Sequence, residues 1–404
     1  MNHAWSKGLS ALLLSALIPA SSFAQIEKIS DSTAADYRSK LPEVQKMAVP
    51  GMKALLSSLD KKDEAAVINA VRVANDMIAA GMKQDAKVLH YAVPAMSEYQ
   101  RLADTYPLDG SFQSPVRIIA AGDEYEPGSF VVYPLENLGK VEFRLTPFKN
   151  KDGKVFDSAN LDLKVIKVWY QNGNGWYSYF GDTGLKLTPE LLLNDEDLIE
   201  VDTENEQNYA RVTEKDGSVS KVWLTPPLEF DKRHDHWREV RVFQPMKEHF
   251  QDAETLQPVT LNRGEFKQFF LTVHVPANTS AGLYSGNVEM IRNGGKIGEI
   301  PVTIRVLPYN LPAPKTYYDV NKDFLTASYS YISLAMIAEE NGGDYVLAEK
   351  QLEAVLRNQA EHNQKMHWVG RSAPGTYEFD LTVDTMKKVG MMTDPLISGW
   401  SVGS

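Results

Sequence analysis

The sequence contains no cysteine in 404 residues. Disulfide bonds and thiolate metal sites are therefore excluded, and the fold must depend on its core alone. Basic residues are fewer than acidic ones: the chain has 42 lysines and arginines and 53 aspartates and glutamates, which gives a formal charge of −11. This balance argues against nucleic acid as a partner, because binding phosphates requires a surplus of positive charge. The composition otherwise is that of a globular chain, with 43% hydrophobic residues.

Long apolar runs are missing as well, apart from a short one near the N-terminus. Lys7 precedes an apolar run over residues 11–18, and the small-residue site Ser22-Phe23-Ala24 follows. This order is typical of a secretory signal peptide over residues 1–24. The run is too short for a stable membrane span. We therefore expect an exported protein, periplasmic or extracellular, with no integral membrane segment after removal of the signal.

Residues 25–110 have a helical pattern. In the stretch DKKDEAAVINAVRVANDMIAAGM, apolar residues recur at helical spacing at Val67, Val71, Ala74 and Ile78. Prolines divide the neighbouring segments, so we predict three or four short helices. The apolar stripe is interpreted as a packing face.

Residues 111–312 have a strand pattern instead. Short alternating runs such as VRIIAAG, SFVVYPL and KVEFRLTPF are separated by turn clusters such as KNKDG. Strands at this spacing are typical of a β-sandwich. A loop around TPPLEFDKRHDHW separates residues 111–230 from residues 231–312, and the sequence leaves open whether these form two sandwiches or two halves of one. LTPELLLND is the exception, with a short helical pattern.

Residues 313–404 begin as a proline-rich linker and continue as a β/α alternation. The stretch NGGDYVLAEKQLEAVLRNQAEHN predicts a helix, MHWVG a strand, TVDTMKKVG a second helix and DPLISGW a further strand. A β/α barrel needs about 250 residues, so we expect only the incomplete start of one. The predicted fold class is mainly β: a sandwich preceded by a short helical region and followed by an incomplete, barrel-like β/α segment.

An aromatic cluster in VWYQNGNGWYSYFGD is the candidate binding site. Trp176, Tyr177 and Tyr179 lie beside glycines and asparagines that indicate a turn. An exposed indole or phenol ring can stack on the apolar face of a sugar, so these three residues are candidates for carbohydrate binding. The alternative is that the aromatic side chains fill the sandwich core.

No catalytic residue, metal ligand or cofactor is predicted. Two clusters combine histidine with carboxylates: His234, Asp235 and His236, and Glu361, His362 and His367. Neither has a further ligand at zinc-like spacing. The acidic residues Asp123, Glu124 and Glu126 form no recognisable acid/base pair. The run NDEDLIEVD, which contains Asp195, Glu196 and Asp197, is interpreted as a solvated turn.

Several stretches resemble secreted multidomain proteins allied to glycoside hydrolase family 123. They are AGDEYEPGSFVVYPLENLGKVEFRLTPFKNKDG, VHVPANTSAGLYSGNVEM and GEIPVTIRVLPYNLP. The resemblance implies an N-terminal β-sandwich followed by a β/α barrel. In that family a pair of acidic residues in the barrel acts on N-acetylated β-galactosaminides, with the substrate's acetamido group as nucleophile. The pair has no matching position here, so none is assigned.

Two function classes remain open. The first is a secreted glycoside-hydrolase-like protein whose chemistry lies beyond residue 404, so that this chain alone is inactive. The second is a non-catalytic carbohydrate-binding or structural module. Carbohydrate is the expected partner in the first class and in the binding form of the second, and the sequence does not indicate an oligomeric state.

Overall fold

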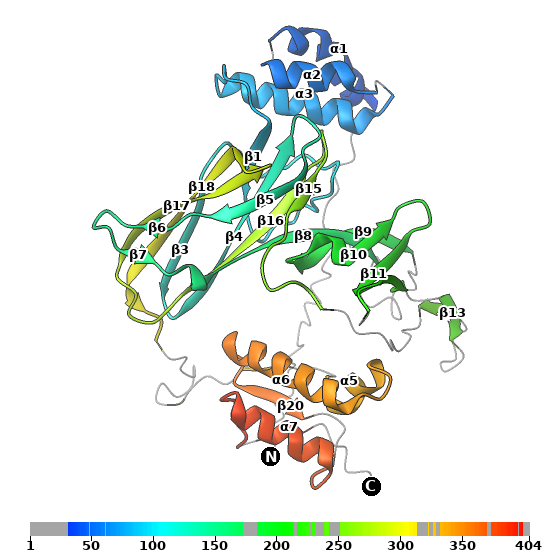
Figure 1. Cartoon of the computed structure of the whole chain (residues 1–404), viewed down its shortest axis with the longest axis vertical. Coiled ribbons are helices and arrows are strands. Elements are labelled where there is room, and N and C mark those ends of the chain that lie inside the picture. The colour runs from blue at the N-terminus through cyan, green and yellow to red at the C-terminus, as the bar shows by residue number, and fades with distance from the viewer. Residues whose placement is uncertain are drawn as a thin grey trace, which may run out of the picture.

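The structure is a computed structural model. It describes residues 31–47, 49–60, 62–172, 184–213, 216–225, 228–231, 238–241, 251–312, 322, 326–328, 332–369, 373–394 and 396–398. Strands predominate, a helical layer precedes them, and a smaller β/α segment follows (Figure 1). The predicted fold class is therefore confirmed.

The helices and strands follow one another in distinct blocks. The α-helices are α1 (Asp31–Met47), α2 (Pro50–Ser58), α3 (Glu64–Ala79), α5 (Leu334–Glu340), α6 (Tyr345–Glu361) and α7 (Tyr377–Lys388). The strands before residue 184 are β1 (Val88–Val93), β2 (Ser111–Phe112), β3 (Val116–Gly122), β4 (Glu124–Pro134), β5 (Gly139–Leu145), β6 (Phe148–Lys149), β7 (Val155–Phe156) and β8 (Leu161–Asn172). The later strands are β9 (Leu185–Leu193), β10 (Ile199–Asp202), β11 (Gln207–Thr213), β12 (Val219–Trp223), β13 (Leu228–Asp231), β14 (Arg238–Arg241), β15 (Val259–Leu261), β16 (Lys267–Val275), β17 (Gly282–Arg292), β18 (Gly295–Asn310), β19 (Ala327–Ser328), β20 (Met366–Val369) and β21 (Ile397–Ser398).

Two large sheets form a single sandwich. One has the order β2-β1-β4-β16-β8-β9, and the other has the order β15-β5-β17-β18-β3. Each sheet combines strands from before residue 230 with strands from after it; β16, for example, pairs with both β4 and β8. The two strand series of the sequence are thus two halves of one sandwich.

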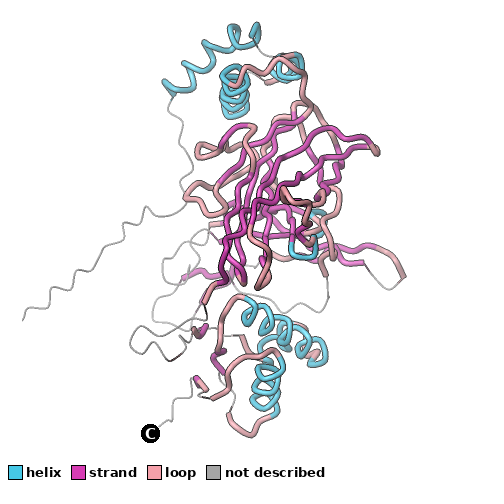
Figure 2. Tube along the Cα trace, turned by 90° about the vertical axis from the view of Figure 1, so that its left-hand side faces the viewer, coloured by secondary structure: helices cyan, strands magenta, loops and turns pink. Residues whose placement is uncertain are grey.

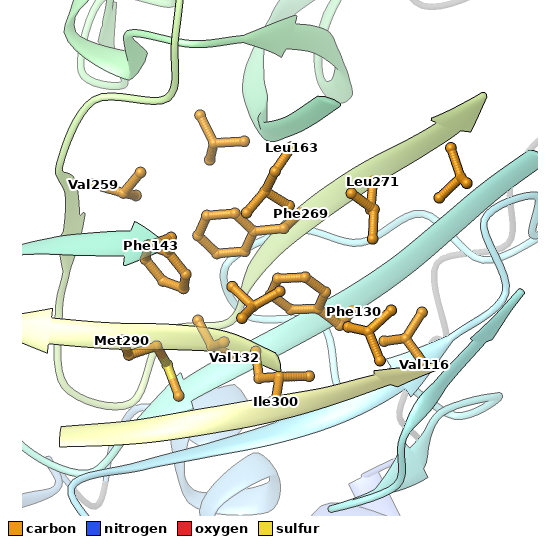
Figure 3. Packing of buried hydrophobic residues seen from close by; sticks show 14 of the residues in the cluster. Val116, Phe130, Val132, Phe143, Leu163, Val259, Phe269, Leu271, Met290 and Ile300 are labelled. Carbon is orange, nitrogen blue, oxygen red and sulfur yellow. The ribbon is translucent and has the colours of Figure 1, made fainter. Parts of the chain in front are cut away.

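The sandwich core follows from the alternation of side chains along each strand. On β16, Phe269, Leu271 and Val273 are fully buried and point toward the second sheet. Ile300 and Met290 of the facing strands meet them (Figure 3). Residues between these positions, such as those at 268 and 270, must therefore point to the outer face of the six-stranded sheet.

A layer of helices covers one part of that outer face. The side chain of Asp63 caps α3 by accepting from the Ala66 N–H at 3.0 Å. The helices pack against Tyr91 of β1, Tyr133 of β4 and the neighbouring Phe266 (Figure 2 shows the layer above the strands). The helical region is shorter than predicted, because residues 88–93 form a strand of the sheet, between β2 and β4.

The stretch LTPELLLND is a strand rather than a helix. It forms most of β9, which pairs with β8 along its whole length and shifts register beside Pro189. Strand pairing therefore overrides the local helical spacing of its leucines. After β9, the strands β10, β11 and β12 form a small antiparallel sheet. Asn208 fixes this sheet to β8, since its amide side chain exchanges hydrogen bonds with the backbone N–H and C=O of Tyr170 at 3.0 and 2.7 Å.

The C-terminal segment is a β/α unit. Strands β19, β20 and β21 pair in parallel, and α5, α6 and α7 pack together with β20 around Leu352, Val369 and Met386. The predicted strand MHWVG and the helices on either side of it are confirmed. The described residues of this segment form no closed barrel.

Candidate functional site

The three predicted sugar-binding residues, Trp176, Tyr177 and Tyr179, lie outside the described residues. They belong to the connection between β8 and β9, whose two strands are described up to residue 172 and from residue 184. The surface next to this hairpin can therefore be analysed, while the aromatic candidates stay a prediction.

A pocket of about 350 Å³ lies against the β8–β9 hairpin, on the outer face of the six-stranded sheet. Its floor is formed by side chains that alternate with core residues, among them Ile166 of β8 and Phe270 of β16. The full lining is Ala95, Ser97, Tyr99, Gln100, Arg101, Ile166, Thr188, Pro189, Glu190, Leu192, Gln268 and Phe270. The pocket thus adjoins the part of the face that the helices cover.

One wall of the pocket is held rigidly by a buried ion pair. Arg101, only 5% exposed, contacts both carboxylate oxygens of Asp109 at 2.8 Å. Ser97 donates a hydrogen bond to the same carboxylate at 2.7 Å. Burial raises the pKa of Asp109, but the hydrogen bonds and the arginine charge lower it by more, so that the net shift is downward. Gln100 then joins this wall to β9 by donating to the Leu187 carbonyl at 2.8 Å.

The polar side chains of the pocket are oriented by hydrogen bonds. Gln268 donates through Nε2 to Ser129 Oγ at 3.0 Å, which leaves its amide oxygen as an acceptor in the lining. Glu190 accepts from the Trp169 indole N–H at 3.2 Å. Side chains that are already held in place lose little conformational freedom when a ligand binds.

This combination of groups fits a small polar ligand with an apolar face. Phe270, Tyr99 and Leu192 supply apolar surface, and Gln268 and Glu190 supply acceptors for hydroxyl groups. Glu190 is the only carboxylate in the described lining. The pair of carboxylic acids on which most glycoside hydrolysis depends is therefore missing from the lining residues.

The sequence did not point to this pocket. Its lining comes from four segments that are distant in the chain, namely residues 95–101, 166, 188–192 and 268–270. The available signal was the phase of alternation: in KQFFLTVHV, once Phe269 and Leu271 are assigned to the core, Gln268 and Phe270 must share the opposite face. Nothing in the sequence indicates that a concave surface forms there.

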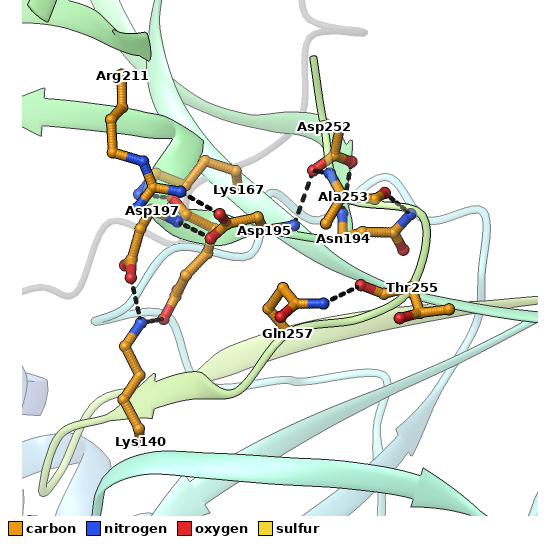
Figure 4. A network of polar contacts seen from close by, with 11 residues as sticks. Lys140, Lys167, Asn194, Asp195, Asp197, Arg211, Asp252, Ala253, Thr255 and Gln257 are labelled. Atoms are coloured by element: carbon orange, nitrogen blue, oxygen red, sulfur yellow. Dashed lines mark hydrogen bonds and ion pairs between the residues drawn. The ribbon is translucent and has the colours of Figure 1, made fainter. Parts of the chain in front are cut away.

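The sequence suggested that the acidic run at residues 195–197 is a solvated turn, but in the structure it is only partly solvated. Asp195 caps a short 3-10 helix, and Glu196 turns inward and is 5% exposed. Lys267 lies 2.6 Å from its carboxylate. Around it, Lys140 pairs with Asp197 at 2.7 Å (Figure 4). These ion pairs fasten the start of the small sheet to the sandwich, so their role is structural.

Two carboxylates at the start of β4 do interact. Glu124 accepts a hydrogen bond from the Ala121 N–H at 2.6 Å. The pKa of Glu126 is raised, mainly by burial and then by the charge of Glu124 and a hydrogen bond between the two side chains. Neither side chain lines the pocket beside β9.

A second pocket, of about 470 Å³, lies at the turn between β6 and β7. It is lined by Lys149, Asn150, Lys151, Asp152, Ala281, Gly282, Leu283 and Ser285. No aromatic ring is among these residues, so it offers no stacking surface for a sugar.

The histidine clusters take up separate environments. His234 and His236 lie outside the described residues. The ring of His362, at the end of α6, stacks on Tyr125 with centroids 5.6 Å apart. His367 is buried in β20, its Nδ1 lies 3.1 Å from Gln359 Oε1, and burial lowers its pKa. In the described part of the chain, no group of three or more acidic or histidine side chains is arranged to hold a metal ion.

None of the described helices is both long enough and apolar enough to cross a membrane.

No protein-family model matches the chain, and no curated protein matches it. Among solved structures, it is similar to a family 123 glycoside hydrolase from Clostridium perfringens, described for glycolipid glycan hydrolysis. The identity is 11% and the TM-score 0.39, over 68% of this chain and 41% of that one. The chain thus spans less than half the length of that hydrolase.

Two further solved structures are less similar. One is AvmM, which catalyses macrocyclization in alchivemycin A biosynthesis, with 9% identity, a TM-score of 0.21, and coverage of 58% of this chain and 94% of that one. The other is a mutant of the adhesin CfaE of enterotoxigenic E. coli, with 10% identity, a TM-score of 0.17, and coverage of 56% and 49%. At these TM-scores the likenesses carry no inference about function.

Proposed function

We propose that this chain binds carbohydrate through the pocket beside the β8–β9 hairpin. The observation that carries the proposal is the lining itself: an aromatic ring, Phe270, lies in one pocket with two oriented acceptors, Gln268 and Glu190. A sugar ring has an apolar face that can lie on an aromatic side chain and hydroxyls that donate to amide and carboxylate oxygens.

The sequence adds support from two directions. The predicted aromatic cluster at Trp176, Tyr177 and Tyr179 connects the two strands that border the pocket. The stretches from Ala121 to Pro312 resemble a family of carbohydrate-acting proteins. Under this proposal, the connection supplies stacking rings beside a pocket that takes one sugar unit.

The proposed role is binding by this chain, within a protein of glycoside-hydrolase-like organisation. The described lining holds one carboxylate, whereas protonation of a leaving group and attack on the sugar ring are usually shared between two. We also propose that residues 1–24 direct export, so that the protein meets polysaccharide outside the cytoplasm.

The test is the affinity of purified variants for soluble neutral polysaccharides, measured by affinity electrophoresis. Gln268→Ala and Trp176→Ala should each lose a large part of the retardation. Leu108→Ala is the matched control, because Leu108 is 42% exposed and does not line the pocket. Unchanged retardation of both variants, or no retardation of the wild type on any polysaccharide, contradicts the proposal.

A further inference from the structure

The small sheet β10-β11-β12 presents an exposed aromatic side chain on its outer face. Trp223 of β12 is 46% exposed, so about half of its large apolar side chain faces solvent. Tyr209 of β11 lies directly opposite it in the register. Since paired residues of neighbouring strands point to the same face, the indole and the phenol side chain share this face.

The other face of this sheet is packed and fixes the orientation. Ile199, Ala210 and Val212 alternate with the outer residues and are buried. Ile199 and Ala210 belong to the sandwich core. Both side chains therefore project from the outer face of a sheet whose inner face is packed, with Trp223 the more exposed of the two.

The indole is also fixed along its polar edge. Its Nε1–H donates to the side-chain oxygen of Gln207 on the neighbouring strand. The polar requirement of the indole is thus met within the protein, and the exposed part of its ring can contact a ligand.

Two ion pairs lie on the face that carries the two rings. Lys221 pairs with Glu200 across the sheet, with Nζ 2.6 Å from Oε1. Arg211 pairs with Asp195. The guanidinium and carboxylate groups of these pairs are planar and can exchange hydrogen bonds with hydroxyls.

We propose that Trp223 and Tyr209 form a second carbohydrate contact, which takes a neutral glycan chain lying flat across the small sheet. This inference rests on the proposed carbohydrate-binding function and extends it from one sugar unit to a longer chain. The exposed indole, the partly exposed Tyr209 beside it in the register and the paired charges of Lys221 and Arg211 together favour an uncharged glycan as the occupant.

The test is calorimetric titration with cellohexaose, mannohexaose and chitohexaose, and with the corresponding monosaccharides. For at least one hexasaccharide, Trp223→Ala should lower the affinity about fivefold to tenfold, the scale of one aromatic stacking contact. Monosaccharide affinity should not change, because a single unit occupies the pocket beside β9. Trp223→Phe should keep part of the affinity, which separates loss of stacking from loss of folding.

Val219→Ala is the control on the same face, since Val219 is 61% exposed and offers no ring. If Trp223→Ala binds the hexasaccharide as tightly as the wild type while Gln268→Ala loses affinity, this inference is wrong and the proposed function stands. No affinity of the wild type for any of the sugars would overturn both. If Trp223→Ala and Val219→Ala instead disrupt self-association in light scattering without affecting glycan affinity, the face is a protein interface and the inference is wrong.

Discussion

At the residue scale, Glu196 shows how a charged side chain can support this fold from the inside. Burial alone would raise the pKa of its carboxyl group. The charge and hydrogen bond of Lys267, the Thr260 N–H and the charge of Lys167 act in the opposite direction, and the net result is a lowered pKa. The carboxylate is therefore ionised in the folded protein, where it joins residues of the small sheet to the sandwich.

This depressed pKa predicts acid sensitivity. A carboxyl group whose pKa is lower in the folded than in the unfolded state stabilises the folded protein at pH values above the unfolded pKa, which is 4.5 for an ordinary glutamate. This stabilisation is lost as the pH falls through the folded pKa. Glu196→Gln should lower the free energy of unfolding by about 2 kcal/mol near neutral pH. The difference from the wild type should shrink below the ordinary glutamate pKa.

Urea denaturation across pH 3–7 measures this effect. Glu204→Gln is the control, because Glu204 is exposed in the turn between β10 and β11. If Glu196→Gln and the wild type lose stability in parallel as the pH falls, the ion pair has no part in acid sensitivity.

The sequence could not have shown which acid of this run turns inward. Asp195, Glu196 and Asp197 are adjacent and chemically alike. Their difference arises because the 3-10 turn aims only the middle side chain at Lys267, which is distant in the chain. Such a choice depends on tertiary contacts, which no local pattern contains.

At the element scale, β17 approaches β6 closely through a glycine. A methyl group at Gly286 would lie 2.8 Å from the ring of Phe148. That ring is fully buried, so it has little room to move away. The close contact between these strands therefore depends on the absence of a side chain at residue 286.

Gly286→Ala should destabilise the protein by about 1–3 kcal/mol through overpacking. Gly295→Ala is the matched control on the next strand, because the nearest atom to its added methyl, the Arg292 oxygen, is 3.6 Å away. Thermal unfolding should place the control near the wild type and Gly286→Ala clearly below it. Equal midpoints for the two variants would show that Phe148 does not limit the space.

Alternation and helical spacing predicted most elements but failed where pairing decides the outcome. The runs that became β3 and β5 alternate, and both were predicted as strands. β9 was predicted as helical because its leucines are spaced for a helix, whereas β8 pairs with it along its length. β1 was missed because VLHYAV, buried on both faces between sheet core and helices, has little alternation.

At the scale of the whole molecule, a stack of three rings connects the sandwich with the C-terminal segment. Tyr125 of β4 lies parallel to His274 of β16, with ring centroids 4.2 Å apart. On the C-terminal segment, His362 stacks on the same tyrosine at 5.6 Å. A contact between rings of the two units gives their junction a preferred geometry.

A double-mutant cycle of Tyr125→Ala and His362→Ala should show a coupling free energy of about 0.5–1.5 kcal/mol, the scale of an aromatic pair. The readout is the unfolding free energy of the C-terminal segment, followed by hydrogen exchange in α6. His274→Ala combined with Tyr125→Ala is the matched cycle within the sandwich. Additive effects of Tyr125→Ala and His362→Ala would mean that the stack does not join the two units.

The sequence predicted the architecture more fully than the site. Composition and strand spacing were enough to predict a sandwich with helices before it and a β/α segment after it, because local sequence patterns determine these features. The pocket was not predictable, since Glu190 and Gln268 are brought together only by the pairing of β9, β8 and β16, and Gln100 joins them through its hydrogen bond to β9.

The central claim is that carbohydrate binds beside the β8–β9 hairpin. The most direct test is hydrogen exchange, followed by mass spectrometry, on the purified chain with and without saturating neutral oligosaccharide. The account predicts slower exchange in residues 95–101 and in β9, with no change in the β6–β7 turn around Asn150. Protection confined to other segments, or none at saturating concentrations of every sugar tested, would contradict it.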